Sequence, residues 1–281
     1  MLNYNKLECK TKPPLQQAKI KGFVNEAVNT TEKSTKASPQ ISTSSASSRG
    51  KNFSRVGILA FQGDVIEHER ILKKLGCEVL EVRTVADLAQ VDALIIPGGE
   101  STVIGFFLEE TGLMKAIKER VAGQGRSEAQ KQLDAGKSRK DYNRDLPIWG
   151  TCAGAIVLAK NIQAEIVPPH LGLMDMTVQR NAYGRQIDSF YTELDIPAIG
   201  INGLKAAFIR APIIVSVQPI VPRGRIFKIA KDLEKNSSAP QILATHERKI
   251  VLVQQGNLLA STFHPELTGD TRLHEYFLGL I

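Results

Sequence analysis

The fold is decided by the stretch Leu146-Pro147-Ile148-Trp149-Gly150-Thr151-Cys152-Ala153-Gly154. Its first half is a short apolar run that predicts a buried strand, and Cys152 follows at the end of that strand between two glycines. A Gly-x-Cys-x-Gly turn from a strand into a helix is the thiol form of the nucleophile elbow, whose glycines permit the sharp turn. We expect a helix over residues 153–160, whose N-terminus favours a thiolate over a thiol.

Upstream of this stretch, strand and helix patterns alternate. Short apolar runs predict strands over residues 55–61, 78–83 and 93–96, and apolar residues at helical spacing predict helices over 64–75 and 103–121. This order is typical of an α/β fold: a three-layer, mostly parallel sheet in a single flavodoxin-like domain, with helices on both faces.

Two glycine-containing turns are expected to share one edge of that sheet. In parallel sheets, ligands bind beyond the carboxyl ends of the strands. Pro97-Gly98-Gly99 and Gly150-Thr151-Cys152 both follow predicted strands. The two turns should therefore face one another.

The last third of the chain predicts shorter strands and a closing helix. We expect strands over residues 206–210, 213–217, 250–254 and 258–263, a hairpin turn at 255–257 and a helix over 273–280. His264 falls at the end of the last of these strands.

The positive charge of the chain belongs to its first residues. The net charge is +7, and residues 1–55 alone carry ten Lys or Arg against three Glu, so the remainder is neutral. We expect residues 1–53 to form a disordered, basic, Ser/Thr-rich extension, and residues 54–281 to form the folded domain. Polar segments at about 122–145 and 222–240 are expected to be insertions. A neutral body without a long apolar run indicates that neither nucleic acid nor a membrane is a partner.

Cysteine usage points to a reducing compartment. The three cysteines, Cys9, Cys77 and Cys152, form no disulfide framework, so we expect a cytoplasmic protein. Organelle targeting by the basic extension is the alternative. No Cys/His cluster has metal-ligand spacing, and we expect neither a metal nor a cofactor.

The spacing of chemical groups suggests a catalytic triad. Cys152 would be the nucleophile, His264 the base that later protonates the leaving group, and Glu266 the carboxylate that orients the imidazole. The backbone N–H groups of Gly99 and Ala153 would stabilise the tetrahedral oxyanion.

The remaining residues of the same types are assigned to structure. Cys77 is expected to be an inert packing residue. The other histidines are expected to lie on the surface or to fill packing positions: His68, His170, His246 and His274.

Several motifs carry a resemblance to a known family. Pro97-Gly98-Gly99-Glu100-Ser101, Gly150–Gly154 and His264-Pro265-Glu266 resemble the class I, or triad, glutamine amidotransferases. Within that superfamily the chain is similar to the glutaminase subunits of pyridoxal 5′-phosphate synthase. The closer likeness is carried by Leu59–Asp64, Gln179–Gln186, Ser189-Phe190, Phe208–Pro212 and His264–Thr268. It covers residues 55–281 apart from the two insertions.

The resemblance implies a substrate, a partner and a set of binding residues. The substrate is L-glutamine, and the released ammonia would pass to a synthase (lyase) subunit in a hetero-oligomer, the glutaminase becoming active on docking. The glutamine-binding positions are Gly99, Glu100, Ser101, Arg180, Ile209 and Arg210. The two arginines suit the α-carboxylate and Glu100 suits the α-ammonium. Gln62 would couple docking to a flip of the Gly98–Gly99 peptide.

Other functions remain open on the sequence. The chain could be a glutaminase for another ammonia-accepting synthase, such as one making imidazole-glycerol phosphate or anthranilate. It could be a cysteine peptidase or γ-glutamyl hydrolase, which would act without a partner. The non-enzymatic alternative is a catalytically inactive scaffold, against which the intact Cys152, His264 and Glu266 argue.

Overall fold

The computed structural model of the chain describes residues 54–122, 146–180, 189–218 and 239–281. The expected extension over residues 1–53 lies outside the described residues, as do nearly all of the two expected insertions and residues 181–186 of the motif Gln179–Gln186. Within the described part, no helix combines the length and the apolar character needed to cross a membrane.

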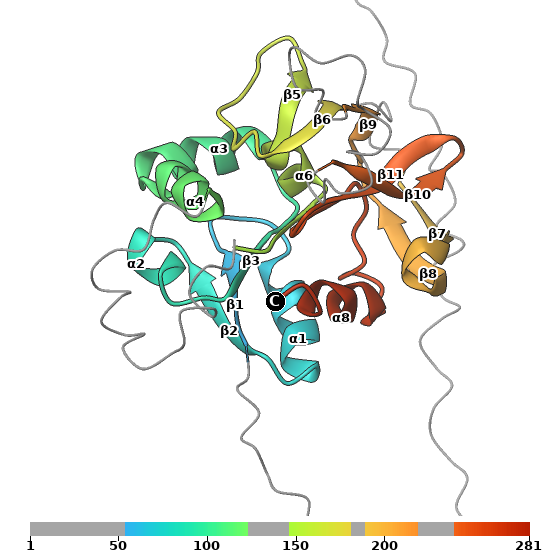
Figure 1. Cartoon of the computed structure of the whole chain (residues 1–281), viewed down its shortest axis with the longest axis horizontal. Coiled ribbons are helices and arrows are strands. Elements are labelled where there is room, and N and C mark those ends of the chain that lie inside the picture. Colours follow the sequence, from blue (N-terminus) through green and yellow to red (C-terminus); the bar gives the residue numbers. More distant parts are fainter. Residues whose placement is uncertain (1–53, 123–145, 181–188, 219–238) are drawn as a thin grey trace, which may run out of the picture. The chain divides into compact units, whose positions relative to one another are not determined.

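A ten-stranded sheet forms the centre of the structure (Figure 1). Five neighbouring strands in the order β2-β1-β3-β4-β12 are parallel. They are β2 Glu78–Val82, β1 Arg55–Leu59, β3 Ala93–Ile96, β4 Ile148–Thr151 and β12 Leu258–Ser261. Every residue of β3, β4 and β12 is buried, which explains why these strands are continuous apolar runs without alternation.

Beyond β12 the sheet becomes mixed. The order continues β11-β9-β6-β5, with β10 also pairing to β11, and only β5 and β6 run parallel to each other in this half. These strands are β11 Lys249–Gln255, β9 Ile213–Val217, β6 Met174–Gln179, β5 Ala159–Gln163 and β10 Gln241–His246.

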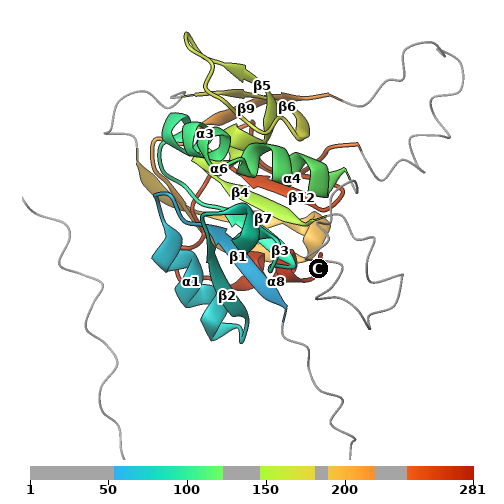
Figure 2. The same ribbon diagram turned by 90° about the vertical axis from the view of Figure 1, so that its left-hand side faces the viewer.

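Two hydrophobic clusters lie on opposite faces of the sheet. One contains side chains of α2 Val85–Leu88, α3 Ser101–Glu110, α4 Leu113–Val121 and α6 Ala153–Leu158. The other contains side chains of α1 Val65–Lys74, α8 Arg272–Leu278 and a two-stranded hairpin, β7 Phe190–Ile196 with β8 Ile201–Phe208, joined through η2 Pro197–Ile199. Figure 2 shows α3, α4 and α6 on one side of the strands and α1 and α8 on the other. The predicted three-layer α/β class is confirmed.

One predicted helix is divided in two, and another ends earlier than expected. The single helix predicted over 103–121 is wrong, because Gly112 adopts a left-handed conformation with φ of 73° and separates α3 from α4. The helix predicted over 153–160 ends at Leu158, because Ala159 turns to an extended conformation and starts β5. The predicted hairpin turn at residues 255–257 is confirmed between β11 and β12.

Sequence reasoning missed the strands β5, β6, β7 and β10. Strand β5 reads Ala-Lys-Asn-Ile-Gln and buries only its first residue, so it has no apolar pattern to find. It is held by its pairing with β6, which is a long-range interaction.

Candidate active site

Cys152 lies at a sharp turn between β4 and α6. Its backbone has φ of 49° and ψ of −102°, an unusual conformation for a residue with a side chain, and one that costs on the order of 1–3 kcal/mol. The Cys152 N–H donates to the carbonyl of Ser261 at 2.8 Å, which ties the turn to the neighbouring strand β12. The cysteine is thus held in the strained geometry of a nucleophile elbow, as the sequence predicts.

The two glycines beside the elbow are required by close backbone contacts. A Cβ at Gly154 would lie 2.1 Å from the carbonyl oxygen of Ile96 in β3, and a Cβ at Gly150 would lie 2.5 Å from the backbone of Gly154. Helix α6 can therefore approach the sheet closely only with glycine at both positions.

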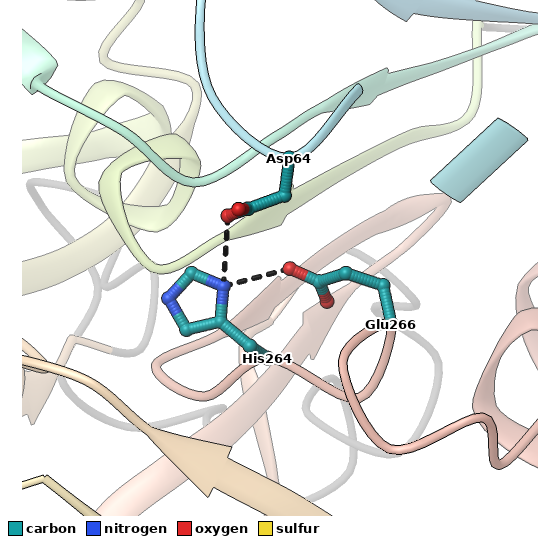
Figure 3. Close-up of side chains that lie close together, drawn as sticks. All are labelled: Asp64, His264 and Glu266. Carbon is teal, nitrogen blue, oxygen red and sulfur yellow. Dashed lines mark hydrogen bonds and ion pairs between the residues drawn. The ribbon is translucent and has the colours of Figure 1, made fainter. Parts of the chain in front are cut away.

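His264 is fixed to β8 by its backbone. Its N–H donates to the carbonyl of Ala207 at 2.8 Å, and its own carbonyl accepts from the Ala207 N–H. The Nδ1 atom of its imidazole lies 2.7 Å from Oε1 of Glu266 (Figure 3). Both side chains are almost wholly buried. The ring is thereby oriented, and Nε2 is left as the nitrogen for proton exchange.

The surroundings of His264 favour its protonated form. Burial alone would lower the pKa of His264, but hydrogen bonds to Asp64, Cys152 and Glu266 raise it well above its ordinary value. Burial raises the pKa of Glu266, and the hydrogen bond to His264 offsets only part of that rise. A cysteine and a histidine in mutual contact can exchange a proton to give a thiolate and an imidazolium.

Two buried histidines lie behind the triad. Nδ1 of His68, in α1, is 3.0 Å from Nε2 of His274, in α8, and Nε2 of His68 is 3.4 Å from Oγ1 of Thr151. The same Nε2 lies 3.7 Å from Oε2 of Glu266, an oxygen without a hydrogen bond in the described structure. Burial lowers the pKa of His68 well below its ordinary value and that of His274 to about 3, so both rings are neutral. The prediction of packing positions holds for these two, and their hydrogen bonds were not foreseen.

The loop from Gln62 to Asp64 packs against Gly98 and Gly99. Nε2 of Gln62 donates to the carbonyl of Glu100 at 2.6 Å. A Cβ at Gly63 would lie 1.7 Å from the carbonyl oxygen of Gly98, so this oxygen points at Gly63. In a trans peptide the N–H points the opposite way, and the Gly99 N–H is therefore directed away from Gly63.

A pocket of about 490 Å³ opens in front of Cys152. All residues predicted for the site line it except Gln62, which lies behind Gly99, and Glu266, which lies behind His264. The lining is Asp64, Gly99, Glu100, Ser101, Cys152, Ala153, Ile156, Arg180, Ser189, Ile209, Arg210, Pro212 and His264.

Charged side chains of both signs face this pocket. Nη2 of Arg180 lies 3.0 Å from Oε1 of Glu100. The Glu100 carboxylate also caps α3, accepting from the N–H groups of Thr102 and Val103. Burial would raise the pKa of Glu100, but these hydrogen bonds and then Arg180 lower it. Glu100, predicted as a partner for an ammonium group, thus already has a cationic neighbour and a capping role.

Ile209 and Arg210 follow β8 beside the cysteine. The carbonyl of Ile209 accepts from the Cys152 thiol at 3.9 Å. Arg210 has φ of 46°, a left-handed conformation that is uncommon for a residue with a side chain. The β8–His264 pairing therefore brings the predicted binding residues to the predicted nucleophile and base.

Four lining residues were not predicted: Asp64, Ile156, Ser189 and Pro212. Asp64 is the most informative, because its Oδ2 lies 3.2 Å from Nδ1 of His264 (Figure 3). The sequence signal that could have identified Asp64 as a site residue was its position two residues after Gln62. Its side-chain direction could not be read from the sequence.

Comparisons with known proteins agree with this geometry. Residues 58–281 match the SNO glutamine amidotransferase family. The chain is 41% identical over 224 residues to the pyridoxal 5′-phosphate synthase subunit PdxT of Carboxydothermus hydrogenoformans, covering 80% of this chain and 96% of the relative. It is 44% identical over 228 residues to the subunit of the same name from Herpetosiphon aurantiacus, covering 80% and 99%. A crystal structure of a glutamine amidotransferase matches with a TM-score of 0.60 and 40% identity, covering 80% of this chain and 97% of that one.

Proposed function

The chain belongs to the SNO glutamine amidotransferase family, and we propose that it hydrolyses L-glutamine and delivers the ammonia to a synthase subunit that makes pyridoxal 5′-phosphate. The observation that carries the proposal is that Cys152 and His264 line one pocket, with Glu266 bonded to the imidazole of His264 behind it. The relatives named above support the choice of ammonia acceptor over the alternative synthases.

The pocket supplies groups for both ends of a free amino acid. Arg210 and Arg180 donate to the α-carboxylate, while the carboxylate of Glu100 suits the α-ammonium. Arg180 keeps further N–H groups for a ligand, since one nitrogen, Nη2, makes its contact with Glu100. The side-chain amide of glutamine is then directed at Cys152.

The reaction proceeds through a thioester. The Cys152 sulfur attacks the amide carbon, and the N–H groups of Gly99 and Ala153 stabilise the oxyanion. His264 gives its proton to the leaving nitrogen, and ammonia departs as the C–N bond breaks. Neutral His264 next takes a proton from water, which attacks the thioester to release glutamate and restore the thiol. Glu266 holds the imidazole oriented throughout.

We propose further that the catalytic domain spans residues 54–281 and that the basic residues 1–53 are an extension outside it. The small and odd number of cysteines supports a cytoplasmic location. Gln62 is assigned to coupling between the docked synthase and the Gly98–Gly99 peptide, because its side chain is bonded to Glu100 beside that peptide.

The test is glutamate release by the purified chain, alone and with the synthase subunit from the same source. We expect strong stimulation by the synthase. Full activity of the chain alone would indicate a free-standing amidase, and no activity in either case would indicate a scaffold. Either of the last two results contradicts the proposal.

A further inference from the structure

Nδ1 of His264 faces two carboxylates, and only one of them belongs to the predicted triad. Oε1 of Glu266 lies at 2.7 Å and Oδ2 of Asp64 at 3.2 Å (Figure 3). Both carboxylates converge on the same ring nitrogen from different elements: Asp64 precedes α1, and Glu266 follows β12. One N–H at Nδ1 is thus shared between them, which is the arrangement expected around an imidazolium.

The Asp64 side chain contacts His264 and does not cap helix α1, although Asp64 is the first residue before that helix. It is the N-cap residue of α1, where an aspartate side chain normally accepts from the backbone at the start of the helix. Here the side chain makes no capping hydrogen bond. Its carboxylate oxygen Oδ2 is directed at Nδ1 of His264 instead.

Gly98 leaves room for the contact. A Cβ at this position would lie 2.7 Å from Oδ2 of Asp64 and 2.3 Å from Cε1 of His264. Any side chain here would therefore press between the carboxylate and the ring. The Gly98–Gly99 peptide therefore packs directly against the Asp64–His264 pair, and glycine is required at position 98.

The two carboxylates differ in their access to water. The side chain of Glu266 is wholly buried, whereas that of Asp64 is 29% exposed and lines the pocket. A partly hydrated carboxylate keeps its negative charge at lower cost than a buried one. Asp64 is therefore suited to balance the positive charge of the His264 imidazolium, and Glu266 is suited to fix the orientation of the ring.

We propose that Asp64 is a positioning residue for the glutaminase reaction, a second carboxylate on His264 that holds the imidazole in its protonated form beside Cys152. In this step the proton leaves Sγ of Cys152 and binds Nε2 of His264, giving a thiolate and an imidazolium. The inference rests on the proposed function, since the ion pair is the nucleophile of that reaction.

The charged and titratable groups around His264 come from four parts of the fold. They are Cys152 after β4, Glu266 after β12, Asp64 and His68 at α1, and Arg210 after β8, which lines the same pocket. Of these, Asp64 and Glu266 are the anions in contact with Nδ1. Removing either should lower the pKa of His264, and Asp64 can be removed without leaving a buried group unpartnered.

The experiment is an NMR titration of His264 in the full chain labelled with ¹⁵N-histidine, without glutamine or synthase. In Asp64→Asn the pKa of His264 should fall by about one unit or more, because an opposite charge at this distance shifts a pKa by roughly 1–3 units. Asp64→Glu, which retains the carboxylate, should give a value closer to the parent. Glu67→Gln, which removes a carboxylate from the first turn of α1, is the control and should leave the pKa unchanged.

A second readout is the rate at which iodoacetamide alkylates Cys152 at neutral pH, which should fall about tenfold in Asp64→Asn. An unchanged pKa of His264 in a folded Asp64→Asn chain would overturn the inference, as would an equal fall in Glu67→Gln. If Asp64→Asn does not fold, Asp64→Glu and the parent are compared instead, and a pKa in Asp64→Glu lowered by a unit would overturn it. Because no readout uses glutamine, failure of the glutaminase assay would be seen separately.

Discussion

Oε1 of Glu266 lies 2.7 Å from Nδ1 of His264, inside the protein and away from the pocket. Glu266 can therefore act on catalysis through the imidazole and not through the substrate. Substitution of Glu266 is therefore expected to change kcat and not KM.

Glu266→Gln should lower kcat by about 10³- to 10⁴-fold with little change in KM, because the ring loses its orienting anion. Steady-state glutaminase assays in the presence of the synthase measure both constants. Glu110→Gln, at an exposed position of α3, is the matched control. A raised KM with an unchanged kcat would show that Glu266 contacts the substrate.

Arg210→Ala should raise the KM for glutamine by about 10- to 100-fold, since a hydrogen bond to a charged group contributes about 1.5–3 kcal/mol. Arg210→Gly separates the side chain from the strained backbone and should raise the KM equally. Arg248 also has a positive φ, of 65°, so Arg248→Ala is a control for the backbone. An unchanged KM in both Arg210 variants would remove this side chain from the binding site.

Gly63→Ala should reduce kcat by about 10²-fold or more, because its Cβ would displace the Gly98 carbonyl and with it the oxyanion donor of the same peptide. Gly200 has a similar positive φ, of 70°, but nothing lies within 4 Å of a Cβ there. Gly200→Ala thus carries the same backbone strain without the clash. Equal losses of activity in the two variants would refute the oxyanion explanation.

His274→Leu should change how stability depends on pH. The pKa of His274 is about 3 when folded and about 6.5 when unfolded, so between these values the unfolded chain binds a proton that the folded chain does not. The contribution of His274 to the free energy of unfolding therefore decreases as the pH falls from about 6.5 towards 3, by about 1.4 kcal/mol per pH unit. Urea unfolding at several pH values should show that the free energy of unfolding decreases less steeply towards acid pH in His274→Leu than in the parent.

The control for this measurement is His170→Gln, which removes a histidine that is only partly buried. This variant removes an imidazole outside the buried His68–His274 pair, and it shows how far the loss of any one histidine changes the measurement. An acid loss in His274→Leu as steep as the parent's would show that the buried ring does not titrate as described.

The sequence predicted those parts of the fold that depend on local patterns. Strands β1, β3 and β4 are short apolar runs, and they lie close to where expected because nearly all of their own residues are buried. Strand β5 and the break at Gly112 could not be found in this way. The first depends on pairing with β6, and the second on one left-handed residue within an otherwise helical pattern.

For the site, motif spacing identified residues but not their directions. Cys152 and Gly99 meet at one pocket because their motifs follow the neighbouring strands β4 and β3 at one edge of the sheet. Arg210 reaches the same pocket because β8 pairs with His264. The Asp64–His264 contact and the buried pair His68–His274 join segments about 200 residues apart. Only the folded structure brings these side chains together.

The most direct test of the account is pyridoxal 5′-phosphate synthesis by the complex of the synthase with Cys152→Ala, supplied with either glutamine or ammonium chloride. If Cys152 is the nucleophile, the Cys152→Ala complex should give no product from glutamine and parental rates from ammonium, while Cys77→Ala should retain both activities. Product from glutamine in Cys152→Ala would show that this thiol is not the nucleophile. Loss of the ammonium-dependent rate would show that hydrolysis and synthesis are not carried out at separate sites.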